Sequence, residues 1–259
     1  MTQAATAEMI RRPSPLLAAA GGGLGAVALL LLLMGPLGYR IGLWPLSVAL
    51  GLLPRTAMYL GFGGVAVGAL GLLSSLLGRR RAWALIALAG MLAGGASAYV
   101  PLRFRAIGRS VPPINDITTD TEHPPEFQAV MPLREAAHAE PIAYGANVAA
   151  LQKSGYPDIV PLMLDLAPDR ALVLAVDQAR RMGWSIVAID PPHGRLEATD
   201  RTLMYGFTDD IVVRVSNDEG GSARIDVRSK SRVGRGDFGA NAKRVRAYLA
   251  AIKGAGKLN

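Results

Sequence analysis

The stretch Leu16–Met34, LLAAAGGGLGAVALLLLLM, decides what kind of protein this is. Two similar apolar stretches follow, Thr56–Leu77 and Ala82–Val100, and no acidic residue occurs between Leu16 and Leu102. An α-helix needs about 20 apolar residues to cross the roughly 30 Å hydrocarbon core of a bilayer. The sequence therefore predicts three membrane spans, at about 16–34, 56–77 and 82–100, in a transmembrane region that comprises residues 1–105.

Glycines are frequent in these stretches. Two pairs, Gly64/Gly68 and Gly90/Gly94, have the four-residue spacing that lets helices approach closely. The simpler interpretation is that they pack the three spans against one another. The alternative is that the Gly-rich spans bind a membrane-protein partner. No charged residue lies in the middle of a span, which disfavours ion or proton transport, because such transport usually uses a charge there.

The arginines favour one orientation of the spans. The triplet Arg79–Arg81 lies in a very short loop between the second and third spans, and positive charge marks the cytoplasmic side. With three spans, the C-terminal domain then lies on the periplasmic side of a bacterial inner membrane. Arg40, Arg55 and three arginines that follow the third span favour the opposite orientation, and we give the compact triplet more weight.

The composition limits the partners of the chain. Its 259 residues carry a formal net charge of +8, but residues 1–100 hold seven arginines and one acid, so much of this charge flanks the spans. Residues 101–259 have an ordinary globular composition and are long enough for one domain. We expect membrane lipids and no nucleic acid as partners. The absence of cysteine excludes disulfides and thiolate metal sites, and without a phosphate loop or metal cluster we expect no cofactor and no metal.

The C-terminal part changes character near residue 167. Residues 106–166 are rich in proline, which fixes φ and removes an amide donor, so we expect a segment that wraps around the domain. Residues 167–259 show the pattern of an α+β domain: a helix at 168–182, strands at 184–190, 195–199, 207–216 and 223–233, and a helix at about 238–253. This order predicts an antiparallel four-stranded meander packed by helices on one face.

The second hairpin alternates between apolar and charged side chains. Successive strand residues point to opposite faces of a sheet. We expect the face with Ile211, Val213 and Ile225 to be buried, and the face with Asp210 and Arg228 to be exposed to water.

Seven short motifs in this domain resemble a known family. They are Tyr156-Pro-Asp-Ile, Gly183-Trp184, Arg195-Leu-Glu-Ala-Thr199, Gly206-Phe207-Thr-Asp-Asp210, Arg224-Ile-Asp-Val-Arg-Ser229, Ser231-Arg-Val-Gly234 and Asp237-Phe-Gly-Ala-Asn241-Ala. In this order they resemble the bacterial and plastid family called domain of unknown function 1499, over roughly residues 112–252. The string from Asp226 to Asn241 is the most specific part.

That resemblance implies a domain without an agreed activity. Some members look like exported lipoproteins with a Ser-Pro-Asn-Cys start, and here Pro113-Ile-Asn-Asp116 stands in its place. The cysteine is missing, so no lipid attachment is implied, but the similarity favours a domain outside the cytoplasm.

Five polar residues are predicted to meet where the sheet joins the last helix: Asp209, Ser229, Ser231, Asp237 and Asn241. Buried polar groups must be hydrogen-bonded. One interpretation is a network that pins this helix to the sheet, with Asp237 as its N-cap. The other is a pocket for an anionic group at the helix N-terminus, usable by an enzyme that acts on a lipid or envelope substrate. No histidine is placed beside the serines and no Gly-x-Ser-x-Gly elbow occurs, so no catalytic residue is assigned.

Charge is unevenly distributed in the domain. Residues 222–259 hold ten basic and two acidic residues, whereas residues 111–221 hold eight basic and 17 acidic ones. In one interpretation the acidic part covers the basic sheet face and pairs with it. In the other, a basic face binds anionic lipid headgroups or an acidic partner. The candidate residues of this face are Arg214, Arg224, Arg228, Lys230, Arg232, Arg235 and Arg244.

These patterns together favour an uncharacterised membrane-anchored envelope protein. Its C-terminal domain is interpreted as a non-catalytic binding or accessory module for a partner protein or anionic lipid at the membrane surface. The alternative is an enzyme that uses the polar pocket at the last helix.

Overall fold

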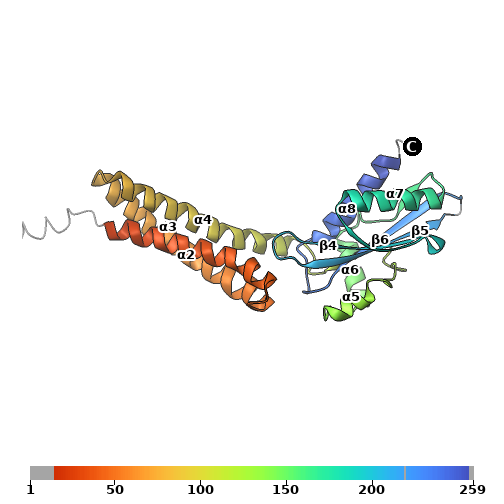
Figure 1. Cartoon of the computed structure of the whole chain (residues 1–259). Coiled ribbons are helices and arrows are strands. Elements are labelled where there is room, and N and C mark those ends of the chain that lie inside the picture. The colour runs from red at the N-terminus through yellow and green to blue at the C-terminus, as the bar shows by residue number, and fades with distance from the viewer. Residues whose placement is uncertain (1–14, 219, 257–259) are drawn as a thin grey trace, which may run out of the picture. The chain divides into compact units, whose positions relative to one another are not determined.

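The computed structural model describes residues 15–218 and 220–256. The chain divides into two compact units, with the boundary after Ala106 (Figure 1). Each unit is built on its own core.

Three long helices form the first unit. They are α2 (Pro15–Arg40), α3 (Leu53–Leu77) and α4 (Arg81–Ser110), and the π-helical turn η1 (Val48–Leu52) runs directly into α3. Each of the three helical stretches is long and apolar enough to span a membrane, which confirms the prediction of three long apolar helices. The helices continue beyond the predicted limits, because hydropathy marks the part suited to hydrocarbon, whereas backbone hydrogen bonds extend the helix into more polar sequence.

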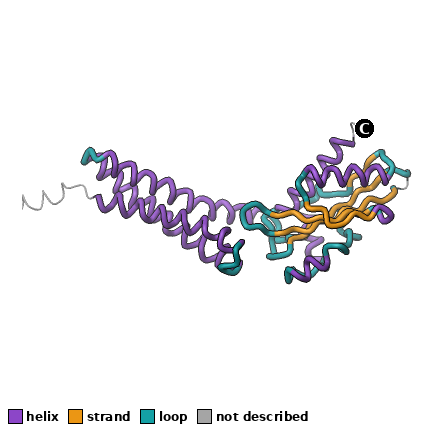
Figure 2. Tube along the Cα trace, in the orientation of Figure 1, coloured by secondary structure: helices purple, strands orange, loops and turns teal. Residues whose placement is uncertain are grey.

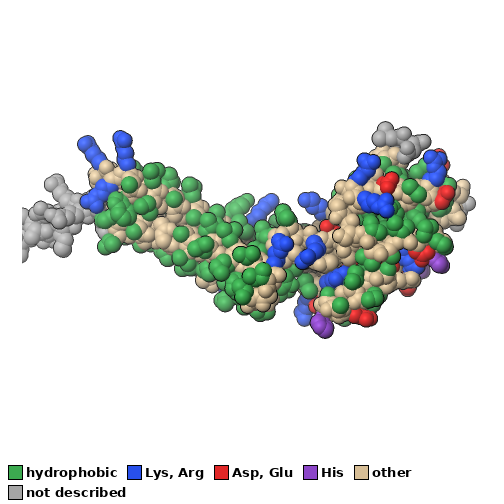
Figure 3. Space-filling view, viewed as in Figure 1, with side chains coloured by type: hydrophobic (Ala, Val, Ile, Leu, Met, Phe, Trp, Pro, Cys, Tyr) green, Lys and Arg blue, Asp and Glu red, His purple; other side chains and the backbone are tan. Residues whose placement is uncertain are grey.

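Leucines and glycines take opposite positions in this unit. Leu30, Leu73 and Leu85 are exposed on the bundle surface, where apolar side chains predominate (Figure 3). The glycines lie where the helices touch: a Cβ atom placed on Gly94 would lie 2.7 Å from the carbonyl oxygen of Gly61. Close backbone approach of this kind requires residues without side chains. The three helices therefore pack against one another through their glycines, as the simpler interpretation of the sequence expected.

We predict that Gly94→Ala destabilises the helical bundle by about 1–3 kcal/mol, because the added methyl overlaps the backbone of α3. Gly95→Ala is the matched control, since a Cβ there would meet only Val65, at 4.0 Å. Thermal unfolding of the full chain in detergent micelles measures the difference. Equal melting temperatures for the two variants would contradict the close contact.

An antiparallel sheet forms the centre of the second unit. Its strands are β1 (Asp116–Thr118), β2 (Leu162–Leu164), β3 (Ser185–Asp190), β4 (Arg195–Arg201), β5 (Thr208–Asn217) and β6 (Ala223–Ser231). They lie in the order β1-β6-β5-β4-β3, and β2 pairs with the other end of β6. Figure 2 shows the strands, in orange, with helices on both sides of them. The predicted four-stranded meander, β3 to β6, is confirmed. The proline-rich segment adds β1 and β2, whose pairing covers the outer edge of β6.

Two helices cover the inner face of the sheet. α7 (Pro168–Arg181) and α8 (Ala240–Gly256) pack there over the main hydrophobic core. The Trp184 and Tyr248 rings lie 4.5 Å apart between centroids, and the Tyr248 hydroxyl donates to the Ala175 carbonyl at 2.7 Å. This bond satisfies the one polar atom of a fully buried ring and fixes α8 against α7.

The outer face of the sheet is also covered, so the prediction of a water-exposed face is wrong. Residues 116–145, which include α5 (Met131–Ala136), lie over it. Phe127 and Val130 pack on Val212, and the buried Glu197 carboxylate accepts the amide protons of Gln128 and Val130 at 2.9 and 3.0 Å. Alternating polarity normally indicates one wet face. Here the polar face is buried by a segment that is itself polar.

One side chain fastens the start of this segment. Gln152, on α6 (Ala146–Gly155), accepts the Thr118 amide proton at 3.0 Å and donates to the Thr118 carbonyl at 2.5 Å. Its amide group thus replaces a neighbouring strand at the free edge of β1. This buried contact holds α6 beside the sheet.

Candidate functional site

The ion pairs of the outer face begin with Arg228. Its guanidinium makes two bonds to Asp116, at 2.9 and 2.8 Å, and donates to the carbonyl of Ile142 at 2.6 Å. The Phe127 and Tyr144 rings lie 5.1 and 5.5 Å from its central carbon. Arg228 is 4% exposed. A bidentate pair held between rings compensates for the cost of removing this charge from water.

The other charges of this face are also paired. Asp210 binds Arg134 at 2.6 Å and Arg232 at 2.7 Å. Asp226 binds Arg214 and Arg224, each at 3.0 Å. Lys230 joins Arg228 on Asp116, at 2.9 Å. The segment that precedes the sheet in the sequence therefore pairs with charged residues of the sheet face, as the first interpretation of the charge distribution expected.

The candidate basic residues fall into three environments. Arg228, Lys230 and Arg232 are held inside the covered face. Arg214 and Arg224 keep about a third of their side chains exposed, and Arg235 is exposed. Arg244 lies on the opposite side of the sheet, among the residues of the predicted polar pocket. The set therefore does not form one continuous surface.

The structure brings the predicted polar pocket together around Asn241. Its side chain accepts from the Ser229 hydroxyl at 2.6 Å and donates to Ser231 at 2.9 Å and to the Asn115 carbonyl at 3.0 Å. The helix begins at Ala240 and not at 238, because Phe238 and Gly239 have positive φ, so Asp237 is not the adjacent N-cap residue; its carboxylate still accepts the backbone amides of Gly239 and Asn241 at the start of α8. We call this cluster the Asn241 network.

Arg244 also belongs to the Asn241 network, although the sequence analysis assigned it to the basic face. It donates to Asp209 at 2.6 Å, to Ser229 at 3.1 Å and to Asp200 at 2.9 Å. Ser229 therefore has an amide oxygen and a guanidinium as hydrogen-bond partners, and no base. The arrangement pins α8 to the sheet. The signal that could have identified Arg244 is helical spacing, because it lies three residues after Asn241 on the same helix face.

The pKa of the Asp237 carboxyl is raised above its usual value. Burial raises its pKa, although the two amides that it accepts favour the charged form and act in the opposite direction. The nearby Asp209 carboxylate raises this pKa further. Asp237 thus binds the start of α8 from a site that disfavours its charge.

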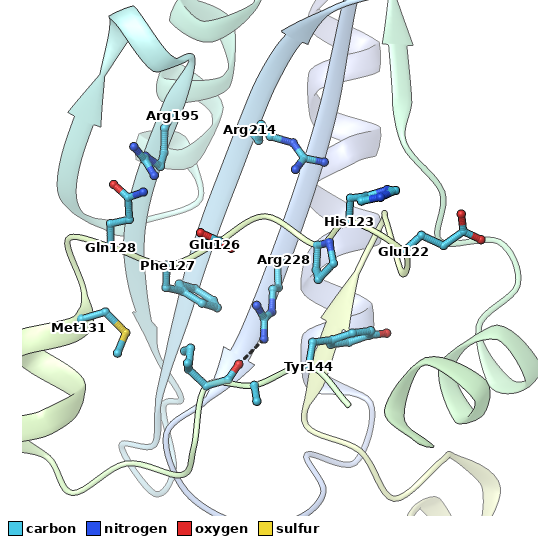
Figure 4. Close-up of a pocket in the computed structure, with 13 residues that line it drawn as sticks. Glu122, His123, Glu126, Phe127, Gln128, Met131, Tyr144, Arg195, Arg214 and Arg228 are labelled. Atoms are coloured by element: carbon cyan, nitrogen blue, oxygen red, sulfur yellow. Dashed lines mark hydrogen bonds between the residues drawn. The ribbon is translucent and has the colours of Figure 1, made fainter. Parts of the chain in front are cut away.

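A groove of about 750 Å³ opens on the covered outer face. Its lining residues come from the segment 122–144 and from three adjacent strands (Figure 4). They are Glu122, His123, Pro124, Glu126, Phe127, Gln128, Met131, Ile142, Ala143, Tyr144, Arg195, Arg214 and Arg228. The volume lies within the range of small-molecule sites in proteins.

The groove combines an apolar part with two accessible cations. Phe127, Met131 and Ile142 supply apolar surface. Arg195 and Arg214 are opposite each other in the register of β4 and β5, with side chains 18% and 34% exposed, and their guanidinium groups extend in different directions (Figure 4). Like charges directly opposite in a sheet repel. Asp190 binds Arg195 at 3.1 Å, and Asp226 and Asp120 bind Arg214 at 3.0 and 3.2 Å, so each arginine has a carboxylate partner and keeps only part of its side chain exposed in the groove.

Sequence reasoning did not find most of this groove. It identified Arg214 and Arg228 from their charge, but it treated the segment that contributes Phe127 and Tyr144 as a wrapping loop. Burial raises the pKa of Tyr144, whose hydroxyl donates to Gln152 at 3.1 Å. No local pattern marks such residues, because the groove exists only where the segment lies on the sheet. Within the described residues, no group of His, Asp and Glu side chains is arranged to hold a metal ion.

We predict that Arg228→Met destabilises the C-terminal domain by about 3–5 kcal/mol, because Asp116 is left buried with a weaker set of partners. Arg246→Met is the control. Its exposed pair with Asp158 contributes at most about 1 kcal/mol. Urea unfolding of the full chain in micelles, followed by pulse proteolysis, gives both values. A loss at Arg228 no larger than that at Arg246 would contradict the role given to the buried pair.

Comparison with curated proteins gave no match. The family described as protein of unknown function (DUF1499) matches residues 116–252. The match begins at β1, ends within α8 and includes both the groove and the Asn241 network. It agrees with the resemblance seen in the motifs, and it covers more than half of the chain. This chain therefore belongs to the DUF1499 family of proteins of unknown function.

Proposed function

We propose that this protein is a membrane-anchored, non-catalytic binding module whose groove takes an amphiphile with an anionic headgroup, such as an anionic lipid. The observation that carries the proposal is the pairing of Arg195 with Arg214 at the apolar groove. A hydrocarbon portion fits against Phe127 and Met131. The headgroup fits beside the two guanidinium groups, which can donate to a phosphate or carboxylate in a bidentate manner.

The charges around the groove define which headgroup fits. Arg228 is 4% exposed and bound by Asp116 and carbonyl oxygens, whereas Arg195 and Arg214, which also have carboxylate partners, keep 18% and 34% of their side chains exposed to a ligand. Glu122 and Glu126 also line the groove, and their carboxylates repel a second negative charge. The groove is therefore suited to a headgroup with a single anionic group in contact with the arginines. A polyanion such as a nucleic acid would meet both glutamates.

The lining residues favour binding over catalysis. They include one histidine, His123, and no serine, cysteine, threonine or lysine that could serve as a nucleophile. Arg195 and Arg214 are suited to hold an anion, and neither is suited to transfer a proton at neutral pH. In this proposal the domain captures or presents its ligand, and an accessory role beside another envelope protein is consistent with that activity.

Ligand selection provides the test. We expect the full chain in zwitterionic nanodiscs to bind lysophosphatidylglycerol at least about tenfold more tightly than lysophosphatidylcholine, with both probes below their critical micelle concentrations. Arg195→Gln should remove about that factor of ten, equivalent to about 1.4 kcal/mol. Microscale thermophoresis measures the dissociation constants.

Arg180→Gln is the matched control, because it removes a similarly charged side chain from an exposed pair on α7, away from the lining residues. Equal affinity for the two lysolipids, or an equal effect of the two substitutions, would exclude an anionic lipid as ligand. Detergent-free co-purification then tests whether a partner protein, and not a lipid, occupies the groove. Recovery of a protein that depends on Arg195 would identify a partner protein as the occupant.

We place the protein in a bacterial inner membrane with the C-terminal domain on the periplasmic side. The support is the Arg79–Arg81 triplet, which lies at the junction of α3 and α4. A membrane-protein partner that packs on the Gly-rich spans is a further part of this proposal. It would use a face other than the one that holds α2, α3 and α4 together, because Gly61 and Gly94 are in contact there.

Labelling of single cysteines tests the orientation, since the natural chain contains none. On intact spheroplasts, a membrane-impermeant maleimide should label Val173→Cys on α7. It should leave Gly78→Cys, at the α3–α4 junction, unlabelled until the cells are lysed. The reverse pattern would place the domain in the cytoplasm.

A further inference from the structure

The loop between β4 and β5 is strongly apolar and exposed. Leu203 is 93% exposed and Met204 is 55% exposed. Behind them, the Tyr205 and Phe207 rings stack at 5.2 Å with an interplanar angle of 7°, which gives the loop a rigid base. Adjacent exposed Leu and Met side chains at a loop tip cost free energy in water. They are typical of a surface that meets an apolar partner.

This loop lies at the end of the sheet where α4 enters the domain. Asp209, near the start of β5, pairs with Ser231, the last residue of β6, and the Arg232 amide donates to the Thr208 carbonyl. The residues after Ser231 lead from this end of the sheet into α8. Phe238 lies next in this connection, and its ring is 3.0 Å from a Cβ position on Gly108. Gly108 belongs to the last turn of α4, so the apolar loop and the end of that helix share one end of the domain.

Few residues separate the third candidate span from this end of the domain. The helix α4 has 30 residues, Arg81–Ser110, of which about 20 suffice for the hydrocarbon core. β1 begins six residues after the helix ends, so the connection is short.

Charge at this end of the domain matches a membrane surface. Arg201 precedes the loop and Arg235 lies in the β6–α8 connection, and both are exposed. Basic residues beside exposed apolar side chains attract anionic headgroups, while the apolar tips enter the boundary between headgroups and acyl chains. Tyr205 is amphipathic and suits the same depth.

We propose that the β4–β5 loop, residues 202–207, is a second membrane contact that inserts Leu203 and Met204 into the bilayer that holds the three helices. This contact fixes the C-terminal domain against the lipid surface. The occupant is the bilayer itself. A protein bound to the loop is the competing outcome of the test.

Single-cysteine labelling on the otherwise cysteine-free chain tests this contact. Leu203→Cys carries the fluorophore NBD in the full chain, reconstituted in vesicles of phosphatidylcholine and phosphatidylglycerol. We expect a blue-shifted emission and quenching by acyl-chain doxyl lipids at least threefold stronger than at the control position. Met204→Cys should behave in the same way.

Val173→Cys is the control, since Val173 is 64% exposed on α7 and lies outside the loop. Quenching of the Leu203 label by aqueous iodide to the same extent as the Val173 label, without doxyl quenching, would overturn the proposal. Protection of the label at position 203 from iodide only after a protein extract is added would also overturn the proposal. The groove residues are not altered by these substitutions, so failure here leaves the lysolipid experiment on Arg195 as a separate result.

Discussion

Burial of charge on the outer face of the sheet is the constraint on which the C-terminal domain depends. Asp210 and Asp226 are fully buried, and Arg228 is nearly so. Each of these charges would cost several kcal/mol alone in the interior. The segment 116–145 supplies Asp116 and Arg134 as partners and covers the face. Separation of the two would leave Arg228 without Asp116 and Asp210 without Arg134, although Asp210 would keep Arg232 and Asp226 would keep Arg214 and Arg224.

The same constraint creates the groove. The covering segment cannot seal the sheet completely, because its path is set by particular contacts: Glu197 fixes the amides of Gln128 and Val130, and Arg228 binds the carbonyl of Ile142. Between these attachment points Phe127, Met131 and Tyr144 line a space that opens towards Arg195 and Arg214. The strand side of this groove is formed by β4, β5 and β6, which are hydrogen-bonded to one another. It also changes if the ionic contacts of the segment change.

The two sides of the sheet use polar residues differently. Under α8, the Asn241 network satisfies each of its members with another member, and the helix is held in one position. On the outer face, two arginines retain exposed guanidinium surface beside apolar side chains. This difference favours a structural role for the first cluster and a binding role for the second. At the sheet end near α4, the exposed Leu203 belongs to neither cluster and supports a third role, contact with lipid.

The sequence by itself determined the three long apolar helices, the β3–β6 meander, the two helices of the inner face and the position of Asp237 just before α8. These features depend on hydrophobic periodicity and on local backbone hydrogen bonds, both of which are recorded within a few consecutive residues. Only the tertiary structure decided that the charged face of the sheet is buried, that Arg244 joins the Asn241 network, and that Phe127 and Tyr144 line a groove with Arg195. These outcomes depend on contacts between residues that are far apart in the sequence, such as Asp116 and Arg228, which are 112 positions apart. An alternating strand pattern looks the same whether water or a distant, oppositely charged segment covers its polar side.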